Sequence, residues 1–379
     1  MSLLRTRPVA TPAMIAVFDD AQTIAHALAF ETALADAQAA EGVIDADSAR
    51  AIAAAVEAIV IDPGALAEDA ALAGTLAIPL VKQLRAALTG EAAAALHSGA
   101  TSQDIADTVL MRQVRAAAAL LLADVARVSG ALAGLARDHA ATPAIGRTLL
   151  QDAQPIGFGL RIAQWQAGIA VAAARLSREV ATGAALQWGG AAGTRPDQQG
   201  KAAAVAARLA TALDLADAPP WHARREGLAG IAAALGILIG ALAKMARDVA
   251  LLAQNAVGEA REPAVAGRGG SSAMAHKRNP TGCQVALSAA TRAPGLVAGI
   301  LSALPAEEER GVGGWQAEGP MLTDLFLLAS GAAEAMAAVA GGLEVDAAGI
   351  ARNLAAAGQG DDIGDSVALV AALLAPRED

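Results

Sequence analysis

The sequence predicts an all-α protein built around a bundle of long helices. Alanine, the best helix former, fills most of the chain between recognisable stops. Alternating runs of Val, Ile, Thr and aromatic residues are nearly absent, and tyrosine does not occur at all. Expected helices of about 30 residues would be about 45 Å long. Rods of that length bury their apolar faces only against one another, which predicts a long bundle.

Start and stop signals divide the chain into successive helices. Gly42 and Gly90 suit helix ends because glycine adopts the left-handed conformation readily. Asp47 is a plausible N-cap, and Asp62-Pro63 is a stop. In chain order, the expected helices are Asp19–Glu41, Asp47–Ile61, one with Pro79 in its first turn that runs to Leu88, Ser102–His139, Gln154–Thr182, Gln198–Leu215, Gly227–Glu259 and Asn279–Leu304.

The 379 residues are enough for two or three domains. We expect an N-terminal helical domain over 1–100, a central long-helix bundle over 101–336, and a short, truncated C-terminal helical region over 337–379. Contacts between alanine-rich helices bury little apolar surface area per residue. We therefore expect other subunits to cover part of the apolar surface, in an obligate oligomer.

Composition excludes several classes of protein. The net charge of −10 argues against a general nucleic-acid binder, which needs a basic face. The single cysteine, Cys283, excludes a disulfide framework and cysteine-based metal sites. The longest uncharged run, 227–243, is shorter than the ~20 residues of a membrane span and is mostly Ala and Gly. It predicts a buried helix rather than a span, and without an apolar leader we expect a cytoplasmic protein.

The first polar segment, HSGATSQD at 97–104, directly precedes a long helix. Thr101 or Ser102 suits the N-cap, and Asp104 suits a capping box. One interpretation is a well-capped helix start and nothing more. The other is an anion site, because hydroxyls and free N–H groups at a helix N-terminus can hold a carboxylate.

The second segment, GRTLLQDAQP at 146–155, lies between two alanine-rich helices. Arg147 can pair with a carboxylate bidentately, and Gln151 can donate from its amide. The alternative is a polar loop that satisfies exposed helix ends.

The third segment spans 267–280 and contains three glycines, Ser271 and Ser272, then Lys277 and Asn279. Its spacing fits neither a Walker A loop nor a dinucleotide fingerprint. A mobile serine beside fixed cations indicates an acid/base residue that a closing loop delivers to an anionic substrate. A Ser-His-Asp hydrolase is the weaker alternative, because the nucleophile-elbow pattern is missing.

Taken together, these segments resemble the fumarase/aspartase superfamily. GSSAMAHKRNP resembles its signature loop, and GATSQD and GRTLLQDAQP resemble its two other active-site segments, in the expected order. TPAMIAVFDD, GTLAIPLVKQL and GGWQAEGP are most similar to the branch that lactonizes 3-carboxy-cis,cis-muconate in protocatechuate breakdown. The resemblance implies a fumarase/aspartase-like fold, a small tricarboxylate substrate, and a homotetramer whose active sites each combine three subunits. It implies no metal, organic cofactor, nucleic acid or membrane.

The same resemblance implies roles for individual residues. Ser271 is implied as the proton donor, with Ser272 as its less favoured stand-in, and Lys277 is implied to stabilise developing charge. The residues implied to bind substrate are Thr101, Ser102, Thr148, Gln151 and Asn279, with His97, Arg147, Met274 and Arg310 as further candidates. We expect His26, His139 and His222 to be helix-surface or interface residues.

Four positions depart from the family pattern. Ala275 replaces a usual Pro, and Gln284 stands where a supporting Glu occurs. Many relatives carry a catalytic His at the position of either Leu149 or Asp152, and here neither residue is His. Expelling an amine or hydroxide needs a general acid, whereas a lactone expels a carboxylate, whose pKa is about 4. The departures therefore favour lactonization. Adenylosuccinate-lyase-type elimination of fumarate and a catalytically silent homologue remain as alternatives.

Overall fold

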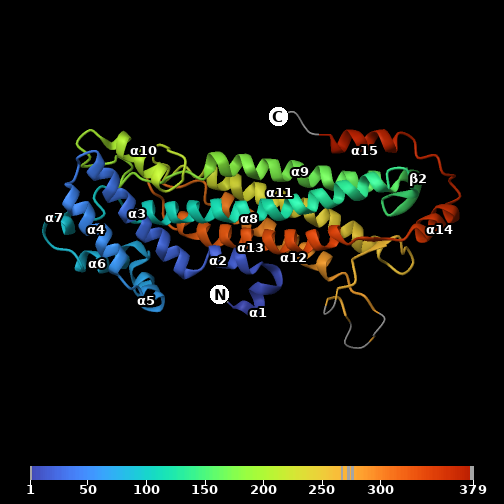
Figure 1. The fold of residues 1–379 in the computed structure, drawn as a ribbon, viewed down its shortest axis with the longest axis horizontal. Helices are drawn as coiled ribbons and strands as arrows, with labels where there is room; N and C mark the ends of the chain where they lie inside the picture. Colours follow the sequence, from blue (N-terminus) through green and yellow to red (C-terminus); the bar gives the residue numbers. More distant parts are fainter. Residues whose placement is uncertain (1, 266–267, 271–273, 275–276, 376–379) are drawn as a thin grey trace.

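The computed structural model describes residues 2–265, 268–270, 274 and 277–375, and over these residues it is mainly helical, as predicted (Figure 1). The long helices run along the longest axis of the molecule. They are α8 (Ser102–Asp138), α9 (Phe158–Gly183), α11 (Glu226–Leu252), α12 (Thr281–Ser302) and α13 (Gly314–Gly341). α11 packs against α9, α12 and α13, and α8 packs against α9 and α13. These helices therefore share one apolar core.

Shorter helices gather at one end of the bundle, on the left of Figure 1. Asp45, not Asp47, caps the second predicted helix, because its side chain accepts the N–H of Ser48. Asp62 begins a helix rather than only ending one, with Pro63 in its first turn. The elements at or leading to this end are α1 (Leu3–Thr6), η1 (Arg7–Val9), α2 (Pro12–Val17), α3 (Asp20–Ala40), α4 (Ala46–Ala58), α5 (Pro63–Ala73), α6 (Ala77–Ala86), α7 (Gly90–Ala95) and α10 (Ala202–Ala212).

The opposite end carries the described strands. β1 (Pro143–Thr148) and β2 (Gln151–Gly157) form an antiparallel hairpin, and β3 (Ala260–Arg261) pairs with β4 (Glu344–Val345). α14 (Ala347–Ala357) packs on β1, and α15 (Ser366–Leu374) returns along α9. The helix predicted to begin at Gln154 therefore starts later, at Phe158, because the preceding residues pair as β2.

The long helix α13 is absent from the helices expected from the sequence. Its segment contains several glycines and Pro320, which read as helix breakers. Most of its apolar residues are buried, so packing against α8, α11 and α12 overrides the low local propensity. The expected boundary at 336–337 falls inside this helix.

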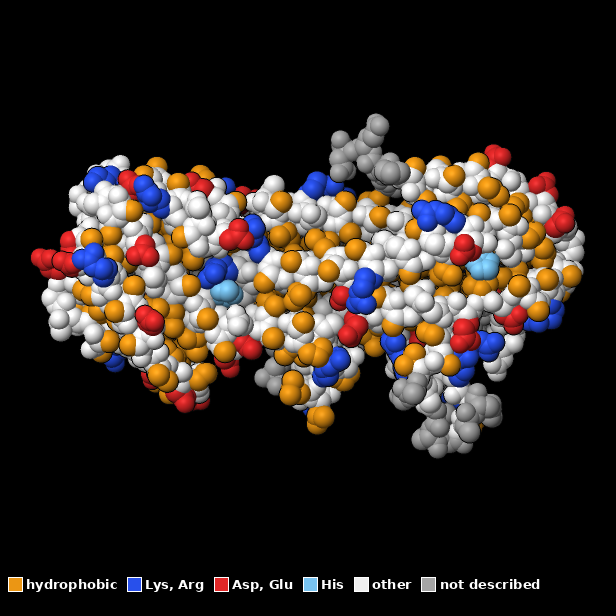
Figure 2. All heavy atoms as spheres, in the orientation of Figure 1, with side chains coloured by type: hydrophobic (Ala, Val, Ile, Leu, Met, Phe, Trp, Pro, Cys, Tyr) orange, Lys and Arg blue, Asp and Glu red, His pale blue; other side chains and the backbone are white. Residues whose placement is uncertain are grey.

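Four of the described helices, α8, α11, α12 and α13, are long and apolar enough to cross a membrane by length and composition alone. They lie in the common bundle, and α11 and α13 are mostly buried by their neighbours. In contrast, only 33% of the most apolar stretch of α8 and 22% of that of α12 are buried within the chain. Apolar side chains also lie between scattered charges along the middle of the face in Figure 2.

Candidate active site

The first polar segment forms the capped N-terminus of α8, as predicted. Thr101 is the N-cap, and its N–H donates to the Asp104 carboxylate at 2.9 Å. Arg310, from the connection between α12 and α13, donates to the Thr101 hydroxyl at 2.7 Å and to the Gln103 side-chain oxygen at 3.3 Å. Ser102 is half-buried in the first turn. The structure therefore brings together Thr101 and Arg310, two candidates that lie 209 residues apart in the sequence.

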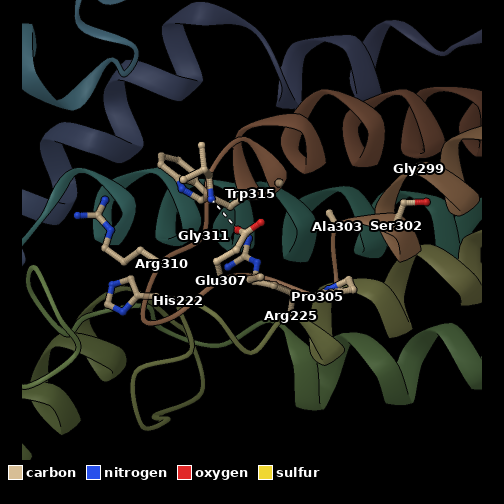
Figure 3. A pocket seen from close by; sticks show the side chains of 13 residues that line it. His222, Arg225, Gly299, Ser302, Ala303, Pro305, Glu307, Arg310, Gly311 and Trp315 are labelled. Carbon is tan, nitrogen blue, oxygen red and sulfur yellow. Dashed lines mark hydrogen bonds between the residues drawn. The ribbon is translucent and has the colours of Figure 1, made fainter.

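A cavity of about 290 Å³ opens beside this helix end, and His222, Arg225, Glu307, Arg310 and Trp315 are among the residues that line it (Figure 3). Arg225 is almost fully buried and pairs with Asp107 and Glu318, so its charge is already balanced. Glu307 accepts the N–H of Val312. Arg310 forms no ion pair with any described residue, so its positive charge is available to an anion.

His222 contradicts the expectation of a helix-surface or interface position. It lies in the connection before α11, is only 3% exposed, and its Nε2 is 2.7 Å from Oδ1 of Asp104. The polypeptide around it is a connecting segment without helical periodicity, so the sequence carried no signal for this pairing.

His97 is also paired with a buried carboxylate. Its Nδ1 is 2.6 Å from Oε1 of Glu31, whose side chain is fully buried on α3. The backbone of His97 has a positive φ of 62°, which is uncommon outside glycine. The contact with Glu31 fixes the imidazole ring at the start of the first segment.

The second polar segment is a β-hairpin rather than an irregular loop. Thr148 and Gln151 pair across a two-residue turn of Leu149 and Leu150, whose φ values are 51° and 62°. Two positive φ values in a two-residue hairpin loop define a type I′ turn. Thr148 and Gln151 are exposed, and the Leu149 side chain is 96% exposed. The hairpin thus projects both polar candidates and two apolar side chains from the end of the bundle.

Arg147, on β1, is held by a buried carboxylate. Its guanidinium donates to both oxygens of Glu259, at 3.0 and 2.6 Å, and lies 3.4 Å from Asp152. Asn353 on α14 also donates to Glu259. Burial alone would raise the pKa of Glu259, but the hydrogen bonds from Arg147 and Asn353 outweigh it and hold that pKa below its usual value. The Arg147 charge is therefore balanced within the chain.

The third polar segment is described in part. Ser271, Ser272 and Ala275 lie outside the described residues. Lys277 is exposed, Met274 is 44% exposed, and the N–H of Asn279 donates to the Gly269 carbonyl at 2.8 Å. Arg278 pairs with Glu344 and donates to the Glu262 carbonyl, which anchors the segment beside β3 and β4. Lys277 is thus presented next to an anchored arginine.

Within one chain, the three segments occupy the two opposite ends of the bundle. The first lies at the start of α8, which has 37 residues and is therefore about 55 Å long. The second follows the other end of α8, and the third lies at that same end (Figure 1). A single chain therefore does not bring all the candidate residues together.

The departures from the family pattern are visible in the hairpin and on α12. Leu149 and Asp152 are exposed at the hairpin, and Gln284 is exposed on α12. No group of three or more His, Cys, Asp or Glu side chains in the described part of the chain is arranged to hold a metal ion.

Comparison with known proteins identifies the class to which this fold and these segments belong. A family model described as lyase matches residues 6–295. The chain belongs to this lyase family, within the fumarase/aspartase superfamily that its segments resemble. It is 47% identical to the 3-carboxy-cis,cis-muconate cycloisomerase of Bradyrhizobium diazoefficiens, over 93% of this chain and 79% of that protein.

A solved structure and a second curated protein are also similar to this chain. The crystal structure of 3-carboxy-cis,cis-muconate lactonizing enzyme from Pseudomonas putida matches with a TM-score of 0.86 and 40% identity, over 93% of this chain and 79% of that one. Nitrosuccinate lyase of Streptomyces davaonensis is 40% identical over 95% of this chain and 78% of that protein. The predicted fold class and enzyme family are therefore confirmed.

Proposed function

We propose that this protein is an intramolecular lyase that lactonizes 3-carboxy-cis,cis-muconate to a carboxymuconolactone. The observation that carries the proposal is the 47% identity to a cycloisomerase of that name over 93% of the chain. The lack of a histidine at Leu149 and Asp152 supports it independently, because a departing carboxylate with a pKa of about 4 needs no general acid.

The proposed reaction is an isomerisation of the substrate acid. Because the attacking carboxylate is ionised, each turnover takes up one proton from solvent, which replaces the proton that the donor serine gives up. One substrate carboxylate oxygen adds to a conjugated double bond, and the resulting carbanion is delocalised onto a neighbouring carboxylate. Lys277 and Asn279 stabilise that charge. Ser271 delivers a proton to the carbanion carbon, with Ser272 as the alternative donor, and becomes the base in the reverse direction.

The remaining candidates bind the three carboxylates of the substrate. Exposed hydroxyl and amide groups of Thr148 and Gln151 project from the hairpin, and Thr101 and Ser102 lie at the N-terminus of α8. Arg310 adds a cation without a carboxylate partner among the described residues. Arg147 and His97 act at the edge of the site, because Glu259 and Glu31 already hold them. Met274 contacts substrate from the third segment.

We also propose that the working unit is a cytoplasmic homotetramer in which each active site takes its three segments from three subunits. The positions of the segments at opposite ends of the bundle support this arrangement. So do the exposed surface of α8, which includes Ala116, Ala119, Leu120 and Ala123, and the low burial of α12 within the chain. Association would bury those surfaces and bring complementary ends of neighbouring bundles together.

The direct experiment adds 3-carboxy-cis,cis-muconate and follows the loss of conjugated-diene absorbance. Lactone formation supports the proposal, and a folded protein that leaves the absorbance unchanged rejects it. Elimination is the second candidate function, because nitrosuccinate lyase is 40% identical. Release of fumarate from adenylosuccinate or nitrosuccinate, in the absence of muconate turnover, would favour that candidate instead.

A further inference from the structure

Asp104 accepts hydrogen bonds from four donors at the start of α8. The donors are the N–H groups of Thr101, Gly189 and Gly190, at 2.9 to 3.0 Å, and Nε2 of His222 at 2.7 Å. Backbone N–H groups can only donate, so both oxygens of this fully buried carboxylate are acceptors. The hydrogen of the His222 contact therefore lies on Nε2. Asp104 thus fixes both the orientation of the His222 ring and the nitrogen that carries the hydrogen.

The other ring nitrogen of His222, Nδ1, has no hydrogen-bond partner in the described part of the chain. The residue is only 3% exposed, yet it lines the cavity that also contains Arg310 (Figure 3). Nδ1 itself is not fully buried, so it stays open to a small molecule. A ligand in the cavity would supply the missing partner.

Two glycines fix the position of the imidazole. Gly189 and Gly190 bring their N–H groups to Asp104, and Gly190 has a φ of +72°. A Cβ at Gly189 would lie 2.8 Å from Cε1 of His222, well inside normal contact. The ring therefore lies against backbone that only glycine permits, and it is held from two sides.

We propose that His222 and Arg310 form a carboxylate subsite in this cavity, with His222 as a substrate-contacting residue and Asp104 as its positioning residue. The carboxylate binds together with one proton from solvent. Nδ1 of His222 holds that proton and donates it in a hydrogen bond to a carboxylate oxygen, and the guanidinium of Arg310 donates beside it. The assignment of this carboxylate to a tricarboxylate substrate rests on the proposed function. His222 thereby supplies a cationic contact that the motifs of the three segments do not contain.

The test separates the two ring nitrogens with two substitutions. In His222→Gln the amide reaches the place of Nε2, so the contact with Asp104 is kept and the group at Nδ1 is lost. In His222→Asn the amide reaches the place of Nδ1, and the contact with Asp104 is lost. His26→Gln, on α3 and outside the cavity, is the matched control. Calorimetry measures the binding of propane-1,2,3-tricarboxylate, an unreactive probe, and thermal unfolding measures the fold.

We expect His222→Gln to bind the probe about 10- to 100-fold more weakly, as for loss of a hydrogen bond to a charged group, with little change in Tm. Its KM for 3-carboxymuconate should rise more than its kcat falls. His222→Asn should lower Tm but recover part of the probe affinity. Wild-type affinity in His222→Gln, or equally weak binding in both variants with a Tm loss in both, would overturn the subsite.

A measurement on the unmodified protein covers the case in which the variants fail to fold. The ¹⁵N resonance of Nδ1 of His222 should shift when the probe is added, and an unchanged resonance at saturation rejects the contact. Because the probe does not react, the two proposals fail separately. Probe binding through His222 without lactonization rejects only the function, whereas lactonization with no role for His222 rejects only the subsite.

Discussion

Buried carboxylates organise the cationic and histidine side chains around the polar segments. Asp104 holds His222, Glu259 holds Arg147, and Glu31 holds His97, and each carboxylate is fully buried. Their partners lie 118, 112 and 66 residues away in the sequence. The exposed candidates could be predicted because they lie in short motifs. The residues that orient them could not, because only the tertiary fold brings these pairs together.

The first residue-scale prediction contrasts Ser271 with Lys277. If Ser271 transfers the proton, Ser271→Ala should lower kcat by about 10²- to 10⁴-fold with little change in KM, because the hydroxyl acts mainly in the transition state. Lys277→Ala should impair both constants, since a cation facing a carboxylate acts in the ground state as well. Steady-state kinetics on 3-carboxymuconate measures both. Near-normal turnover in Ser271→Ala would transfer the role to Ser272 or to bound water.

The second prediction concerns the pH dependence of stability at Glu259. Its pKa is lowered in the folded chain, so its stabilisation is present above the unfolded pKa of about 4.3 and is lost as the pH falls through the folded pKa. Glu259→Gln should therefore lower the free energy of unfolding by about 3 kcal/mol at pH 7, and by progressively less below pH 4.3. Urea titrations across that range measure the difference, with exposed Glu68→Gln as the control. If the difference in free energy of unfolding between the wild type and Glu259→Gln does not depend on pH, the assigned ion pair is contradicted.

At the scale of elements, the sequence predicts the bounds of a helix correctly where its capping residues and its hydrophobic periodicity agree. α8 begins at Ser102 as predicted and ends one residue before the predicted end, because the capping box at Thr101 and Asp104 is local. α13 and the hairpin were not predicted. The glycines and Pro320 of α13 lower its local helix propensity, so its sequence does not indicate a helix. The hairpin turn consists of two leucines rather than the Asn-Gly that this turn type favours. In both cases contacts with distant elements outweigh local preference.

The strained hairpin turn gives a prediction at this scale. Leu149→Asn with Leu150→Gly supplies the preferred residues for a type I′ turn and removes strain of about 1–2 kcal/mol per residue. In an isolated chain the double substitution should only raise the free energy of unfolding, because both leucines are exposed. If the tip enters a site shared between subunits, the variant should instead show a raised KM and a weaker tetramer. Leu72→Asn, at a residue 90% exposed on α5, is the control. A stabilised tetramer with wild-type KM would show that the tip stays in solvent.

At the scale of the whole molecule, the length of the bundle separates the parts of the site. The first segment and Arg310 lie at one end, and the hairpin and the third segment lie at the other. The bundle also leaves apolar surface on α8, and α12 has low burial within the chain. The sequence predicted the long bundle, because alanine-rich helices are easy to recognise. Association of the bundles, expected because such helices bury little area, stays a prediction. It could not show which segments share an end, since that depends on how the chain folds back.

Mixed tetramers test the shared site directly, with one defect placed at each end of the bundle. Ser271→Ala disables the third segment, and Arg310→Glu reverses the charge beside Thr101. Each variant alone should be nearly inactive. If the two segments of a site come from different subunits, refolding equal amounts of the two variants together should regenerate about a quarter of the wild-type sites. Each of the two segments in a site then comes from a subunit that carries it intact with a probability of about one half, independently of the other. Diene absorbance measures the recovery, and unmixed samples carried through the same refolding are the control. Because every chain carries one defect, no recovery in a mixture that sedimentation shows to be tetrameric would mean that each site is built within one chain.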